Sequence, residues 1–167
     1  MDSLPSPAPP RLRPIRPEDE TAVLRLNAAS EHHLSPMGPE RLHQLLGWAD
    51  RADVIEFAST IAGFVLCFAP GTGYDSENYR WFSQEYGSEF YYLDRIAIDD
   101  AFRRQGLAAF AYGELEMVAA RYGRMVLEVD IDPPNDASLA FHAARGYREV
   151  HRLETPGKTV CLMEKQL

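Results

Sequence analysis

Arg103-Arg104-Gln105-Gly106-Leu107-Ala108 is a basic, glycine-containing stretch that separates two segments of different periodicity. The apolar run before it, residues 91–98, is typical of a strand. The segment after it places apolar side chains at helical spacing: Leu107, Phe110, Ala111, Leu115, Val118, Ala119 and Tyr122. The sequence therefore predicts a strand, a turn and a helix in that order, with the turn at the helix N-terminus.

The predicted turn has the properties of an anion-binding site. The first N–H groups of a helix have no partner within the helix, and the helix dipole is positive at that end. Gly106 lets an anion approach the backbone, and Arg103 and Arg104 add charged donors. A pyrophosphate suits these groups. The alternative interpretation is a surface turn with solvated arginines.

A second informative segment, Asn135 to Tyr147, reads N-D-A-S-L-A-F-H-A-A-R-G-Y. With the R-x-x-G-x-A turn placed between a strand and a helix, the chain resembles the GNAT superfamily of acyl-CoA N-acyltransferases. The superfamily loop is written Q/R-x-x-G-x-G/A, and its later segment N-x-x-S-x-x-[FL]-[YH]-x-x-x-G-[FY]. The resemblance covers about residues 12–166.

The resemblance implies an α+β fold with a mixed sheet of six to seven strands and about four helices. Two central parallel strands splay apart, and the pantetheine of acetyl-CoA lies in the gap, paired with strand backbone. Asn135 and Ser138 match positions that contact the cofactor, with helix capping as the alternative. The implied cofactor-binding residues are Ile96, Ala97, Ile98, Arg103, Arg104, Gln105, Gly106, Leu107, Ala108, Asn135 and Ser138.

The implied reaction is direct attack of an amine on the acetyl thioester, and it needs a base. The ammonium of a primary amine has a pKa of about 10 and must lose a proton first. Strand alternation would put Tyr92, Asp94, Ile96 and Ile98 on one face. Asp94 is then a charge on an apolar face, four residues before the expected splay, and is the favoured base.

Glu128, on the neighbouring strand, is the second candidate base, since some superfamily members carry an acid there. Each acid has a structural alternative: an ion pair with an arginine such as Arg95 for Asp94, and a solvent-facing charge for Glu128. The leaving thiolate also needs a proton or a hydrogen bond. The superfamily often has a tyrosine for this purpose where this chain has His142, which is either the acid or a packing residue. A second departure is Asp100, where the family usually has proline.

The chain is expected to form one domain over residues 12–167, after a disordered, proline-rich tail at residues 1–11. The patterns predict about seven strands and four helices, with helices on both faces of the sheet. Gly63, inside a strand, indicates close backbone approach or a bulge. Residues 70–89 form a long, aromatic connection with a short helix around residues 78–86. It is a substrate-pocket wall, a dimer contact or a bland insertion.

Composition excludes several classes of protein. The formal net charge of −8 argues against a nucleic-acid-binding surface. No apolar stretch approaches the length of a membrane span, and no secretory signal opens the chain, so a cytoplasmic location is expected. Cys67 and Cys161 lie in apolar runs and are expected to be buried rather than bridged. No Cys/His cluster has metal-ligand spacing.

These observations favour an acetyl-CoA-dependent N-acetyltransferase that acts on the primary amine of a small or amino-acid-like molecule. A protein N-terminal or lysine acetyltransferase is the enzyme alternative, and an open cleft would favour it. A non-catalytic acyl-CoA-binding protein is the alternative from another class. A homodimer is possible, as in many members of the superfamily.

Overall fold

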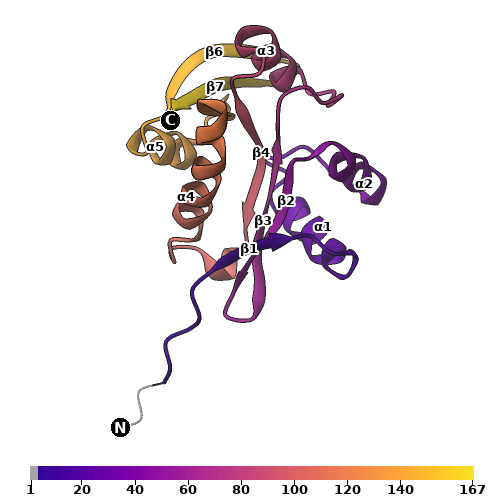
Figure 1. Cartoon of the computed structure of the whole chain (residues 1–167), viewed down its shortest axis with the longest axis vertical. Coiled ribbons are helices and arrows are strands. Elements are labelled where there is room, and N and C mark those ends of the chain that lie inside the picture. Colours follow the sequence, from indigo (N-terminus) through magenta and orange to yellow (C-terminus); the bar gives the residue numbers. More distant parts are fainter. Residues whose placement is uncertain (1–3) are drawn as a thin grey trace.

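The computed structural model describes residues 4–167, and they form one seven-stranded mixed sheet with helices on both faces (Figure 1). The strand order is β1-β2-β3-β4-β5-β7-β6. The strands are β1 (Arg11–Pro14), β2 (Arg51–Phe57), β3 (Thr60–Phe68), β4 (Tyr91–Ile98), β5 (Arg124–Asp132), β6 (Arg148–Thr155) and β7 (Lys158–Gln166). The helices are α1 (Glu20–Ala29), α2 (Pro39–Trp48), α3 (Glu77–Tyr86), α4 (Leu107–Ala119) and α5 (Asp136–Ala144).

Two hydrophobic clusters lie on the two faces of this sheet. One contains buried residues of α1, α2 and α3, and the other contains those of α4 together with residues packed from α5. Figure 1 shows α4 and α5 on the opposite side of the sheet from α1 and α2. Alternating strand residues serve the two clusters, so that Val126 packs with the first and Leu127 and Val129 pack with the second. The α+β class and the sheet predicted from the sequence are confirmed.

The central strands β4 and β5 separate soon after they begin. They are parallel, and they pair only at Tyr91 with Met125 and at Tyr92 with Val126. Beyond Tyr92, the edge of β4 that faces β5 has no strand partner in residues 4–167. The predicted splay is therefore present, but it begins before Asp94 and not four residues after it.

Asp94 is the extra residue of a β-bulge in β4. The pairing with β3 shifts there, because Leu66 lies opposite Arg95 and Cys67 lies opposite Leu93. The expected common face for Tyr92, Asp94, Ile96 and Ile98 is therefore wrong. Tyr92 packs with the α1–α3 cluster, whereas both isoleucines pack with the α4–α5 cluster, since the bulge resets the alternation.

The long connection after β3 contains the expected helix, α3, which is a regular helix of ten residues. Residues 4–167 therefore hold five α-helices, where the sequence predicted about four. Ser76 caps α3, because its hydroxyl accepts a hydrogen bond from the N–H of Tyr79. Tyr79 and Phe82 are buried against the sheet. This packing explains the unusual number of aromatic residues in the connection.

Several smaller predictions can be compared with the structure. A side chain at Gly63 would collide with the carbonyl oxygen of Ala97, and the β2–β3 register shifts beside it, so both predicted reasons for a glycine apply.

Cys67 and Cys161 are buried and unbridged, as expected. The predicted tail lies partly outside the described residues; residues 4–10 have no regular secondary structure, and β1 begins one residue early, at Arg11. Within the described part of the chain, no helix is long and apolar enough to cross a membrane.

Candidate functional site

Two cavities meet at the gap between β4 and β5. The first, of about 450 Å³, is called here the donor cleft and is lined by the turn before α4 and by the end of β4. The second, of about 440 Å³, is called the acceptor cavity and contains Asp94 and Glu128. Both linings include His33, Leu34, Ile96 and Asn135. The two cavities therefore adjoin each other where the strands splay apart.

The donor cleft ends at the acyl-donor turn, residues 103–108. Arg104 and Gly106 have positive φ angles of 61° and 74°, so the turn holds a backbone conformation that a non-glycine residue seldom adopts. Gly106 is the N-cap of α4, and no side chain of the described residues caps this helix. Its first N–H groups and its positive dipole end are therefore available to an anion.

One charge just before this turn opposes anion binding. Arg103 forms an ion pair with Asp100 at 2.8 Å, and both side chains are exposed. The aspartate noted from the sequence thus neutralises one of the two arginines expected to hold phosphate. Such an exposed pair is weak, so it can be broken at small cost.

The predicted cofactor-binding residues gather around these cavities. The donor cleft is lined by the end of β4, at Ile96, Ala97 and Ile98. The backbone of these residues pairs with β3 along one edge of the strand, so the edge that faces β5 is free for hydrogen bonds. The side-chain oxygen of Asn135 accepts from the N–H of Ser138 at 3.3 Å, which confirms the capping role. The donor cleft is also lined by Arg103, Arg104, Gly106, Leu107 and Ala108, whereas Gln105 lies on neither lining.

Glu128 projects from β5 into the acceptor cavity on the α1–α3 face. The hydroxyl of Tyr92 donates to its Oε2 at 2.6 Å. Burial, reinforced by the negative charge of Asp94, raises the pKa of the Glu128 carboxyl to about 8. Asn78 and Lys158 oppose this rise without reversing it. The predicted alternative, a charge facing solvent, does not describe this residue.

Asp94 is held by two neighbours within the same cavity. Arg95 donates to its Oδ2 at 3.0 Å, and the hydroxyl of Tyr74 donates to its Oδ1 at 2.6 Å. Arg95 is itself buried, and its guanidinium also donates to the side chain of Asn27 and to the carbonyl of Ser35. The ion pair that the sequence offered as the alternative to a catalytic role is present.

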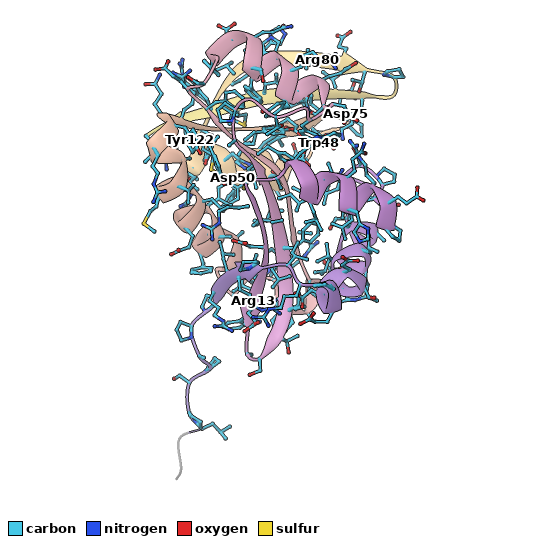
Figure 2. All side chains as sticks on the ribbon, turned by 45° about the vertical axis from the view of Figure 1, so that its right-hand side comes forward. Arg13, Trp48, Asp50, Asp75, Arg80 and Tyr122 are labelled. Carbon is cyan, nitrogen blue, oxygen red and sulfur yellow. The ribbon has the colours of Figure 1, made fainter. Side chains whose placement is uncertain are left out.

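Further charged pairs close the rim of the acceptor cavity. Arg41 of α2 donates to Asp75, which precedes α3, and its guanidinium lies 5.7 Å from the centre of the Trp48 ring. Figure 2 labels Asp75 and Trp48 close to each other. Lys158 forms an ion pair with Asp130 at 3.0 Å. The cavity lining contains five acids and three permanent cations, and each of these cations has an acid partner. The cavity is therefore acidic overall.

His142 is buried on the other face of the sheet, next to a tyrosine that the sequence did not single out. Its Nε2 lies 2.6 Å from the hydroxyl of Tyr112, and its Nδ1 lies 2.7 Å from the carbonyl oxygen of Ser138. Burial lowers the pKa of the imidazole, so the neutral form is favoured. Both side chains line the acceptor cavity.

Sequence reasoning missed four residues that complete the site: Tyr74, Asn78, Tyr92 and Tyr112. Three of them had a signal that was not used. Tyr74 and Asn78 belong to the connection already recognised as long and aromatic, and Tyr112 follows Ala111 on the buried stripe of α4. The observed buried face of α4 includes Tyr112 and Glu116, and it does not include Phe110, which the sequence predicted for it. Tyr92 was placed in the predicted strand, but its hydrogen bond to Glu128 was not predicted.

Comparison with known proteins gives the class. Residues 16–147 match the Acetyltransferase (GNAT) family, so the chain belongs to this family. A search of curated proteins gave no match.

Solved structures share the fold at low sequence identity. Ard1 from Thermoplasma volcanium is 17% identical with a TM-score of 0.75, and the match covers 95% of this chain and 97% of that one. The ribosomal-protein-alanine N-acetyltransferase from Brucella melitensis is 20% identical with a TM-score of 0.68, over 94% and 99%. The yncA protein of Salmonella typhimurium, determined with acetyl-CoA, is 16% identical with a TM-score of 0.64, over 94% and 93%.

The GNAT family uses acetyl-CoA as its acyl donor, and the residues described above fit this molecule. The unpartnered N–H groups at the start of α4 and the two arginines of the turn before it suit the pyrophosphate. The unpaired edge of β4 suits the amide groups of a pantetheine. Among residues 4–167, no group of three or more His, Cys, Asp or Glu side chains is arranged to hold a metal ion.

Proposed function

We propose that this protein transfers the acetyl group of acetyl-CoA to the primary amine of a small molecule by direct attack, with Glu128 as the base. The observation that carries the proposal is the position of Glu128, in a cavity that adjoins the donor cleft at the gap between β4 and β5. An amine bound in the acceptor cavity reaches a thioester in the gap from the side on which Glu128 lies.

The surroundings of Glu128 favour it over Asp94 for this role. A base works best when its pKa is near the working pH, because it is then ionised and still accepts a proton readily. The raised pKa of Glu128 meets this condition. Both oxygens of Asp94 are already engaged, by Arg95 and Tyr74. Asp94 therefore acts on Glu128 through its charge rather than on the amine.

The walls of the acceptor cavity support a small acceptor. They come from the α1–α2 segment, the segment before α3, and the β6–β7 hairpin, and the ion pairs Arg41–Asp75 and Lys158–Asp130 lie on them. A cavity of about 440 Å³ suits a small molecule. Since its cations are paired, an amine without a carboxylate is favoured.

The test combines binding and turnover. Acetyl-CoA and CoA are titrated into the protein by calorimetry, and a free-thiol assay is run with a panel of amines, amino acids and short peptides. We expect micromolar-range donor binding and thiol release with a small cationic amine. Release with peptides alone would support the N-terminal or lysine acetyltransferase alternative, and binding without release from any acceptor would support an acyl-CoA-binding protein.

Glu128→Gln tests the base directly. We expect kcat to fall by about 10²- to 10⁴-fold, with the Kd for acetyl-CoA unchanged, because the amide keeps the shape but accepts no proton. The residual rate should rise with pH as more of the amine becomes neutral. An unchanged kcat at neutral pH would show that Glu128 is not the base.

A further inference from the structure

The hydrogen bond between Tyr112 and His142 has a defined direction. A carbonyl oxygen only accepts, so the 2.7 Å contact with Ser138 requires a proton on Nδ1 of His142. In the neutral imidazole Nε2 is then bare, and it accepts from the hydroxyl of Tyr112 at 2.6 Å. The only proton between the two rings therefore belongs to the tyrosine. A neutral His142 in this form has none to offer the acceptor cavity.

The tyrosine hydroxyl and Glu128 lie on opposite sides of the splayed strands. On β5, Leu127 and Val129 pack in the same cluster as Tyr112, while Glu128 between them points to the other face. The acceptor cavity nevertheless includes Tyr112, His142 and Glu128, because it extends through the gap. A thioester in that gap has a carboxylate on one side and a hydroxyl on the other.

We propose that Tyr112 is a catalytic residue whose hydroxyl turns from Nε2 of His142 to the sulfur of the thioester and hydrogen-bonds it as the C–S bond breaks. His142 is the positioning residue that holds the hydroxyl until then. The proposal rests on the proposed function, because it assigns a second group to the same transfer.

The reaction balances with this assignment. The acceptor ammonium gives one proton to Glu128, which passes it to solvent, and the amine nitrogen forms the C–N bond. The nitrogen then loses its second proton, the C–S bond breaks with its electron pair going to sulfur, and the thiolate takes up one proton to become CoA thiol. Tyr112 keeps its own proton throughout. Burial raises the pKa of its hydroxyl, which favours a hydrogen-bond donor over a proton donor.

Tyr112→Phe removes only the hydroxyl. We expect kcat to fall about 10- to 100-fold, as for a lost hydrogen bond to a charged group, with the Kd for acetyl-CoA and the KM for the amine unchanged. An unchanged kcat would overturn the proposal, and so would a loss of donor binding as large as the loss of rate. A thermal melt establishes that the variant is folded.

A second measurement needs no acceptor. The thiolate of CoA absorbs in the ultraviolet, so the thiol of bound CoA can be titrated on the protein. The hydrogen bond from Tyr112 should hold its pKa lower by about one unit in the wild type than in Tyr112→Phe. Equal values would overturn the proposal. If no amine is acetylated at all, the proposed function fails while this titration still decides the role of Tyr112.

His142 offers the control. In His142→Gln a carbonyl oxygen can still accept from Tyr112 but cannot titrate, and we expect kcat to fall, but by less than in Tyr112→Phe. A loss in His142→Gln larger than that in Tyr112→Phe would make the histidine the acting group and overturn the assignment.

Discussion

The acyl-donor turn and the acceptor cavity belong to adjoining parts of the candidate site but are built differently. The turn consists of six consecutive residues, 103–108, and the groups that we propose to bind the pyrophosphate are backbone N–H groups and two neighbouring arginines. The acceptor cavity takes side chains from β4, β5, α2, α4, α5 and the segment before α3. A local site of backbone groups tolerates change in the rest of the fold. A site of distant side chains depends on how strands and helices pack.

The largest expected effect comes from a charge placed in the turn. Gly106→Glu should weaken acetyl-CoA binding by more than about 100-fold, because it puts an anion where the helix N-terminus attracts one. Gly106→Ala is the matched control. It carries the same cost of a positive φ, and its methyl group meets open space, so the difference between the two variants separates the effect of the carboxylate side chain from that of the backbone. Calorimetry measures both. Equal affinities would remove the pyrophosphate from this turn.

Asp94→Asn should alter the acceptor cavity and leave the turn intact. The charge of Asp94 raises the pKa of Glu128, so its removal lowers that pKa. A base is active when ionised, and the acid limb of the kcat profile should therefore move to lower pH, by about one unit. The Kd for acetyl-CoA should not change. Tyr74→Phe, which removes a hydrogen bond without changing charge, should move the limb less. A limb that moves to higher pH would contradict the charge argument.

The smallest effect is expected from Asp100→Asn. It removes a negative charge beside the phosphate site and frees Arg103, so acetyl-CoA should bind about two- to fivefold more tightly. The gain should shrink at high salt. In an Arg103→Gln background the same change should have less effect. Equal gains in both backgrounds would mean that Asp100 acts on the ligand without Arg103.

Some of the site could be predicted from the sequence because its signals are local. The turn, the helix that follows it and the capping by Asn135 each depend on residues a few positions apart. The faces of β4 could not be predicted in this way. Alternation runs through residues 91–98 without interruption in the sequence, and the bulge at Asp94 appears only as a register shift against β3.

The roles of paired side chains depend on packing for the same reason. His142 was recognised by its position in a motif, but the tautomer of its neutral imidazole follows from Tyr112 and Ser138, one of which is on another helix. Glu128 and Asp94 were both recognised as acids. Their difference follows from burial beside the charge of Asp94 for Glu128, and from the hydrogen bonds of Arg95 and Tyr74 for Asp94.

The sequence by itself indicated the family through two motifs. It also determined the order of the secondary-structure elements and the turn at residues 103–108, because hydrophobic periodicity and glycine conformation act over a few residues. The tertiary structure decided that Glu128 is buried with a raised pKa and that Tyr112 lines the acceptor cavity beside His142. Those properties come from burial and from charges on other elements, and they exist only when the sheet has formed and splayed.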